Sequence, residues 1–221
     1  MRVNKGLMIA ATFDPTKRTS LITVADMCRK IKENSISLPL YQRDISWTLQ
    51  KCIDLLNYQL WGKAPVSPIS INVINTVDSA VPQVSFIDRE IISTIERGQY
   101  SVVDGQQRLT TNYKAYCNHD DFRNIVLDLG KGEFTEVRDS IRSNQIPVGI
   151  LLNKEDTKLF EYTKAKSALG SADVLSVLLQ VRSKMRNYNY TLNSAEDLTE
   201  DEQIELSLIH ISEPTRLQLI S

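Results

Sequence analysis

The stretch SVVDGQQRLTTNY, residues 101–113, constrains the fold of this chain more than any other. Its apolar start has the composition of a β-strand, and this strand ends at Asp104 and Gly105. A helix-favouring run follows, so we expect a helix from about Gln107 to Cys117. A strand that passes directly into a helix indicates a mixed fold of strands and helices.

Other segments repeat this mixture of patterns. Thr23, Thr48 and Ser171 each precede an amphipathic run, and each is a predicted helix N-cap. Strand patterns occur in SPISINVI and YNYTLN, and the pair NIVLDL and EFTEV predicts a β-hairpin. We therefore expect an α+β fold. Residues 1–150 would form a mixed domain, and residues 151–205 would begin a helical extension that is truncated.

Composition excludes several classes of protein. The chain has 221 residues, of which 42% are hydrophobic, so it can bury a core. Its 26 Lys and Arg against 27 Asp and Glu give no global basic signature of nucleic-acid binding. It has neither a membrane-span pattern nor a signal-peptide pattern. Three widely spaced cysteines without a CxxC pair predict a cytoplasmic protein with reduced thiols and no metal site.

The C-terminal sequence LSLIHISEPTRLQLIS, residues 206–221, resembles the translation of a transposon-type sequencing adapter. We expect this tail to be non-native, and we expect the native gene to continue beyond Glu205. His210 would then carry no function.

The residues after the predicted strand have the chemistry of an anion site. The N-terminus of a helix carries partial positive charge and unpaired N–H groups, which suit a phosphate. Gly105 permits a sharp turn, and Arg108 can form a forked contact with phosphate. Gln106 and Gln107 could hold a ribose, a base edge or a water, and Asp104 could bind a metal or orient water. The alternative is a structural turn, with Asp104 as N-cap and Arg108 in a salt bridge.

A second group of residues lies in LPLYQRDISW. Tyr41, Gln42 and Arg43 follow a segment ended by Pro39, and Trp47 comes four residues later. The order P-x-YQR-x-x-x-W, amphipathic helix, strand and VVDGQQRLTT resembles the N-terminal domain of GmrSD-type, type IV restriction endonucleases. That domain has a ParB/sulfiredoxin-like fold, and the resemblance covers roughly residues 20–205.

The resemblance implies a domain that binds and hydrolyses nucleoside triphosphates, with Mg²⁺ as cofactor. The DGQQR motif matches without departure, and YQR matches a stretch near the nucleotide pocket. Carried over, these motifs give Asp104 and Gln107 as catalytic candidates. The implied nucleotide-binding residues are Gln42, Arg43, Gly105, Gln106 and Arg108.

In full-length members of the family, hydrolysis would gate a DNA-cutting domain, often of the HNH type, and we expect this chain to lack that domain because its sequence has no HNH-like histidine cluster. The implied partners are a nucleoside triphosphate, DNA in the full-length protein and a second copy of the chain, but no membrane. The implied biological role is restriction of phage DNA. The alternative is a ParB-like module in which nucleotide switches DNA binding without hydrolysis.

Several other polar or aromatic residues have ordinary structural explanations. Trp47 is expected to pack in the core rather than stack on a base. His119 is expected to lie in a solvated loop after the helix. The cations and tyrosines of SKMRNYNY could contact nucleic acid, although the outer face of a helix explains them equally well.

Overall fold

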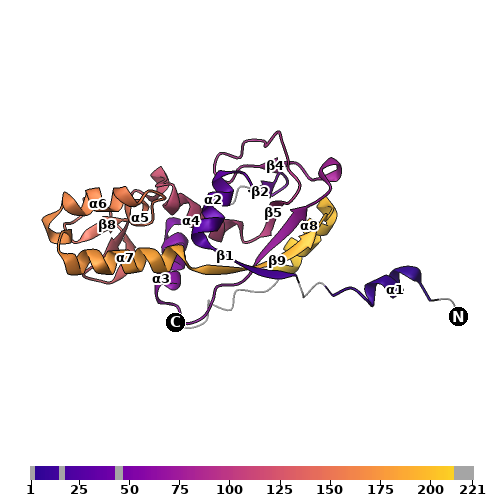
Figure 1. Ribbon diagram of the computed structural model, residues 1–221, viewed down its shortest axis with the longest axis horizontal. Coiled ribbons are helices and arrows are strands. Elements are labelled where there is room, and N and C mark those ends of the chain that lie inside the picture. The colour runs from indigo at the N-terminus through magenta and orange to yellow at the C-terminus, as the bar shows by residue number, and fades with distance from the viewer. Residues whose placement is uncertain (1–2, 15–17, 43–46, 212–221) are drawn as a thin grey trace.

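The computed structural model describes residues 3–14, 18–42 and 47–211, and its centre is a six-stranded mixed sheet (Figure 1). The order of its strands is β1-β9-β3-β5-β2-β4. Their bounds are β1 Thr19–Thr23, β2 Ile36–Pro39, β3 Ile69–Ile74, β4 Gln83–Val84, β5 Gln99–Asp104 and β9 Asn189–Glu196. The expected α+β class is confirmed.

Strand β5 lies between β3, to which it is antiparallel, and β2, to which it is parallel. β9 runs parallel to β3 and antiparallel to the edge strand β1. Strand β9 belongs to residues 151–205, which were expected to begin a helical extension, yet it lies inside the main sheet. Residues 1–150 and residues 151–205 therefore share one sheet.

Two helices pack together over one face of this sheet: α2, Val24–Lys32, and α4, Gln106–Tyr116. Their buried apolar residues share a core with β2, β3 and β5; it includes Met27, Cys28, Leu109, Ile71 and Val102. Helix α8, Glu200–Ile211, contacts β5. Strand β5 is thus in contact with helix α8 as well as with its neighbouring strands.

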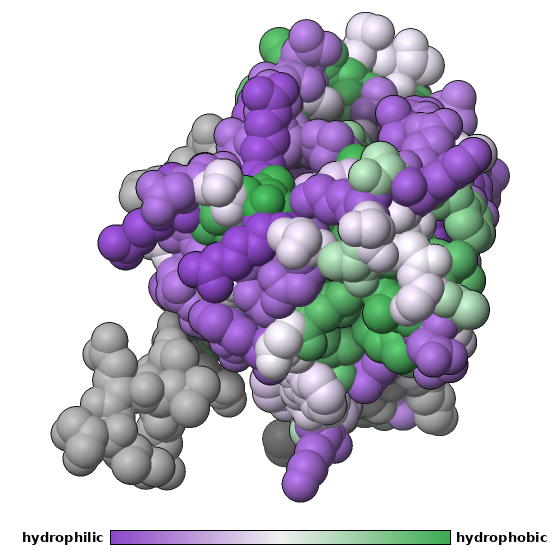
Figure 2. Space-filling model, turned by 90° about the vertical axis from the view of Figure 1, so that its left-hand side faces the viewer, coloured by the Kyte–Doolittle hydropathy of each residue, from purple (hydrophilic) through white to green (hydrophobic). Residues whose placement is uncertain are grey.

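A second core forms a lobe beside the sheet, drawn at the left of Figure 1. Its small sheet has the order β7-β6-β8. The lobe comprises α3 Leu49–Trp61, β6 Ile125–Asp128, β7 Glu133–Glu136, β8 Gln145–Pro147, α5 Val148–Leu151, α6 Asp156–Lys164 and α7 Ala172–Arg186. Figure 2 shows this end of the molecule as mainly hydrophilic with a hydrophobic patch. Exposed apolar side chains on α6 and α7 include Phe160, Val177 and Leu179.

The three predicted N-caps are confirmed. The side-chain oxygens of Thr23, Thr48 and Ser171 accept the N–H groups of Asp26, Lys51 and Val174, respectively. Each bond satisfies one of the N–H groups that a helix leaves unpaired at its start. The predicted hairpin is also confirmed, because β6 and β7 pair from Ile125↔Glu136 to Asp128↔Glu133.

The two ends of the chain contribute little to the cores. Helix α1, Lys5–Ala10, has no buried residue and projects from the body (Figure 1). Of the expected adapter-like tail, residues 206–211 complete α8, where Leu208 and Ile209 are exposed, and residues 212–221 lie outside the described residues. Within the described ranges, no helix is both long enough and apolar enough to cross a bilayer.

Candidate functional site

The candidate site lies where the parallel strands β2 and β5 end side by side. Their register pairs Ile36 with Tyr100 and Ser37 with Ser101, so Pro39 and Asp104 finish at the same edge of the sheet. Binding sites in α/β proteins gather beyond the carboxyl ends of parallel strands, because the loops that follow them meet there. Here Tyr41 and Gln42 follow β2, and the DGQQR motif begins at the last residue of β5.

Gly105 makes the turn from β5 into α4. Its φ is +98°, in the left-handed region that other residues rarely adopt, and it occupies the N-cap position of α4 without a side-chain cap. A Cβ atom at this position would lie 2.3 Å from Cδ1 of Ile69. Glycine is therefore required twice, by conformation and by space. The N-cap residue of α4 therefore contributes no side-chain hydrogen bond, and the N-terminus of the helix carries the partial positive charge that favours an anion.

Arg108 lies one turn into α4 and points toward the start of β3. Its guanidinium donates to the carbonyl oxygen of Ser67, and Nη2 also donates to the carbonyl oxygen of Pro68 at 3.2 Å. Nη2 lies 3.3 Å from Oδ2 of Asp104, and the two side chains are 13% and 35% exposed. Arg108 therefore ties β3 to the corner in this state, while Asp104 keeps partial access to solvent.

Gln42 contacts the other side of the corner. Its Nε2 donates to the carbonyl oxygens of Val102 and Val103, at 2.7 and 2.9 Å. These two acceptors fix the orientation of the amide, because a flipped amide would turn its oxygen toward them. In that orientation Oε1 is buried and has no hydrogen-bond partner in the described part of the chain.

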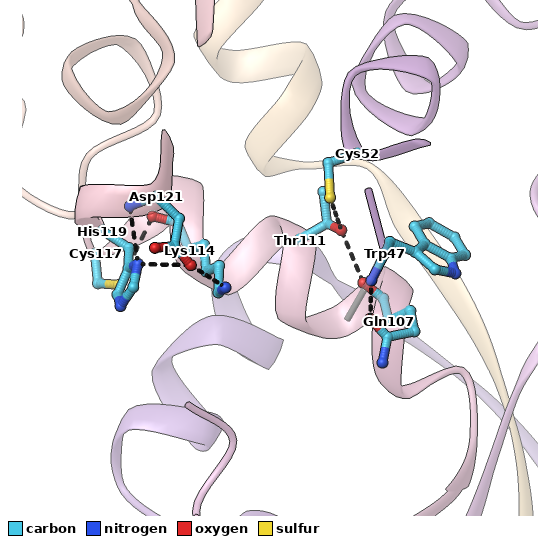
Figure 3. Close-up of polar contacts among 8 residues, drawn as sticks. All are labelled: Trp47, Cys52, Gln107, Thr111, Lys114, Cys117, His119 and Asp121. Carbon is cyan, nitrogen blue, oxygen red and sulfur yellow. Dashed lines mark hydrogen bonds and ion pairs between the residues drawn. The ribbon is translucent and has the colours of Figure 1, made fainter. Parts of the chain in front are cut away.

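Both glutamines of the motif are half-buried. Oε1 of Gln107 accepts the main-chain N–H of Trp47 at 3.0 Å (Figure 3). Trp47 is partly buried and packs against the core of the lobe, which agrees with its expected packing role. Gln42 and Trp47 therefore both bond to residues of the corner, on either side of residues 43–46. Arg43, an expected nucleotide-binding residue, lies outside the described residues.

Tyr41 is turned toward the C-terminal helix rather than the corner. Its hydroxyl donates to Oε1 of Gln203 at 3.3 Å. Burial, together with the nearby charge of Glu200, raises the pKa of the Tyr41 hydroxyl to about 12. Tyr41 therefore remains a neutral donor and links the YQR turn to α8.

Arg89 is a candidate that the sequence did not reveal. It lies in the turn after β4, with φ of +57°, and its Nη2 donates to the main-chain oxygen of Gln42. Its Nη1 is buried without a partner. The signal in the sequence was weak, because a lone arginine in FIDREI has no motif and its left-handed backbone cannot be predicted from pattern.

Two other polar residues, one in α4 and one just beyond its end, have structural roles. Thr111 Oγ1 donates to the main-chain oxygen of Gln107 at 2.8 Å, as helix threonines commonly do. His119 Nδ1 accepts the N–H of Asp121 at 3.2 Å and so caps a short 3₁₀ turn, Asp120–Phe122, beyond α4 (Figure 3). In the described part of the chain, no group of three or more His, Cys, Asp and Glu residues could hold a metal ion.

The comparisons with known proteins identify the family of this chain. The sequence matches the family described as GmrSD restriction endonuclease, N-terminal domain, over residues 24–218. The chain therefore belongs to the GmrSD restriction endonuclease N-terminal domain family, and the match covers both sides of the corner. The last residues of the matched range, 206–218, fall within the adapter-like tail. No curated protein matches the sequence.

Proposed function

We propose that this domain binds and hydrolyses a nucleoside triphosphate at the corner between β5 and α4, in a type IV restriction protein. One observation carries the proposal: the helix begins at a glycine whose left-handed backbone and closeness to Ile69 disfavour any side chain at that position. Phosphate groups suit such a helix end, because its N–H groups and its dipole both favour negative charge. Family membership supports the link to restriction of phage DNA.

Each motif residue has a role in this proposal. Gln106 and the N–H groups of the first turn would bind phosphate oxygens, with Arg108 and Arg43 offsetting their charge. Gln107 would position the YQR turn through its bond to Trp47. Asp104 would orient the attacking water, since one of its oxygens contacts Arg108 and the side chain is open to solvent.

Mg²⁺ fits this corner only as a partner of the phosphates. Asp104 is the single carboxylate of the motif, and hard oxygen ligands from one carboxylate plus phosphates are a common way to hold Mg²⁺. The ion would offset phosphate charge during cleavage. In a longer restriction protein, hydrolysis would then gate a DNA-cutting domain.

The test is nucleotide affinity and phosphate release, measured with Mg²⁺ and each of the four ribonucleoside triphosphates. We expect at least one nucleotide to bind and to be hydrolysed. Arg108→Ala should weaken binding about a hundredfold, the loss expected for a charge-assisted bidentate contact. Arg123→Ala is the matched control, because Arg123 forms an exposed ion pair with Asp120 beyond the far end of α4.

Three outcomes distinguish a nucleoside triphosphatase from a ParB-like nucleotide switch and from a corner without a nucleotide role. Binding with phosphate release supports a nucleoside triphosphatase. Binding without release, together with nucleotide-dependent retention on DNA, would instead support the ParB-like switch. No binding by the unmodified chain, or equal affinity in Arg108→Ala and the Arg123→Ala control, would remove the nucleotide role from this corner.

A further inference from the structure

The turn after β4 places an arginine in a conformation that arginine rarely adopts. Val84 bridges to Ile91 across the turn, and Ser85 N–H donates to the carbonyl oxygen of Glu90 at 2.9 Å. Arg89 stands within this turn with φ of +57°. Glycine or asparagine would adopt this backbone at lower cost. A strained residue whose side chain is also held in place suggests that the side chain itself is needed there.

Only one of the two terminal nitrogens of the Arg89 guanidinium has a hydrogen-bond partner among the described residues. One terminal nitrogen donates to the main-chain oxygen of Gln42, while the other, Nη1, is buried and has no acceptor among residues 3–14, 18–42 and 47–211. No carboxylate of the described residues forms an ion pair with it. Burying a charged donor without an acceptor is costly, so an acceptor with negative charge would stabilise this arrangement.

Gln42, which Arg89 contacts, has an unpaired acceptor where Arg89 has an unpaired donor. Oε1 of Gln42 is buried without a donor, and its orientation is fixed by the carbonyl oxygens of Val102 and Val103. These carbonyls lie on β5 immediately before Asp104. The unpaired acceptor and the unpaired donor therefore occupy two touching residues beside the corner.

We propose that Arg89 is a third cation of the nucleotide site and binds a phosphate oxygen, while Gln42 Oε1 accepts a hydrogen bond from a ribose hydroxyl or an amino group of the same ligand. This inference rests on the proposed function and deepens it. The ligand class follows from the pair of unpaired groups, because a nucleotide carries both anionic oxygens and donors. Arg108 and Arg89 would contact the nucleotide from opposite sides of β5, since Arg108 bonds to the start of β3 and Arg89 to the turn after β2.

The experiment compares Arg89→Gln, Arg89→Lys and the control Arg97→Gln. The control removes an arginine from a different cleft of about 470 Å³, at the opposite ends of β2 and β5. Affinity is measured for the Mg²⁺ complex of the nucleotide that binds best and for inorganic tripolyphosphate, which lacks ribose and base. Thermal melting is recorded for every variant.

We expect Arg89→Gln to weaken binding of both ligands by about tenfold or more, the usual effect of losing a charge-assisted hydrogen bond. Arg89→Lys should recover part of the loss, and Arg97→Gln should bind both ligands as the unmodified chain does. Gln42→Leu should weaken nucleotide binding more than tripolyphosphate binding, because only the nucleotide supplies a donor.

Unchanged affinity in Arg89→Gln, with nucleotide still bound by the unmodified chain, would overturn this inference and leave the proposed function intact. A large fall in melting temperature with unchanged affinity would also overturn it, because Arg89 would then serve only the fold. If nucleotide does not bind but tripolyphosphate binds in an Arg89-dependent way, the proposed function fails and the phosphate site stands. If neither ligand binds the unmodified chain, both fail.

Discussion

Two turns of this protein have an aspartate at the end of a strand and a glycine shortly after it. The two carboxylates differ in exposure and in the number of hydrogen-bond partners. Asp128 ends β6 and is 3% exposed. Its Oδ1 accepts the N–H groups of Gly130 and Lys131 and the amide of Asn144, at 2.9, 3.1 and 3.2 Å, while Oδ2 accepts Nε2 of Gln145 at 2.7 Å. Both oxygens of this carboxylate are therefore paired within the protein.

Asp104 ends β5, and its carboxylate has one described contact, with Arg108 at 3.3 Å. Gln42 Nε2 bonds to Val102 and Val103, just before Asp104, and Arg89 bonds to Gln42. Among the described residues, Gln42 Oε1 and Arg89 Nη1 are buried without partners. The comparison teaches that a carboxylate paired on both oxygens is explained by its own turn, whereas unpaired polar groups near a partly exposed one are what the proposed ligand site would explain.

The largest expected effect is on the Asp128 turn. Asp128→Asn should lower the free energy of unfolding by about 2–4 kcal/mol, because buried donors would face an amide nitrogen in place of an oxygen. Asp104→Asn should cost about 1 kcal/mol or less, since it weakens one partly exposed ion pair. Urea denaturation of the two variants measures both values. Similar losses in both would show that the contrast between the turns is not real.

The second prediction tests the turn of the corner itself. Gly105→Ala should destabilise the fold by about 2–3 kcal/mol, because it combines a left-handed backbone with a Cβ atom 2.3 Å from Ile69. Gly98→Ala is the matched control: its φ is +87°, but its Cβ would meet nothing within 4 Å. The control should cost only about 1 kcal/mol. Equal losses would show that the close approach of Ile69 contributes nothing.

The smallest expected effect is a dependence on pH. The Gln145 amide, with the Lys131 and Gly130 N–H groups, holds the pKa of the Asp128 carboxyl below its usual value. A lowered pKa stabilises the fold at neutral pH, and this contribution is lost as the pH falls through the pKa of the folded state. The difference in melting temperature between the unmodified chain and Asp128→Asn should therefore narrow on acidification from pH 7 to about pH 3. A constant difference would contradict this origin of its stability.

The local parts of this architecture could be predicted from the sequence. Thr23 and Thr48 were recognisable as caps, and the passage from β5 into α4 followed from one apolar run, one glycine and a helical pattern. These features depend on residues close together in the chain. The same is true of the DGQQR corner, whose residues are consecutive.

The non-local parts could not be predicted. Nothing in YNYTLN indicates that β9 lies between β1 and β3, because strand order depends on pairing between distant segments. The bond from Arg89 to Gln42 spans 47 residues and depends on a left-handed backbone in a segment whose pattern was ambiguous. Arg108 was expected to contact phosphate, with a salt bridge as the alternative, and its bonds to Ser67 and Pro68, about 40 residues away in the chain, were not predicted.

The central claim is that Asp104 contributes to nucleotide hydrolysis, whereas Asp128 contributes to the stability of the fold. Its most direct test is phosphate release from the Mg²⁺ complex of the best-binding nucleotide, measured for Asp104→Asn and Asp128→Asn at a temperature where both remain folded. We predict that Asp104→Asn retains most of its nucleotide affinity and releases phosphate at least about tenfold more slowly, because a carboxylate that orients water has been lost. Asp128→Asn should release phosphate at the rate of the unmodified chain. Normal phosphate release by Asp104→Asn would contradict the account.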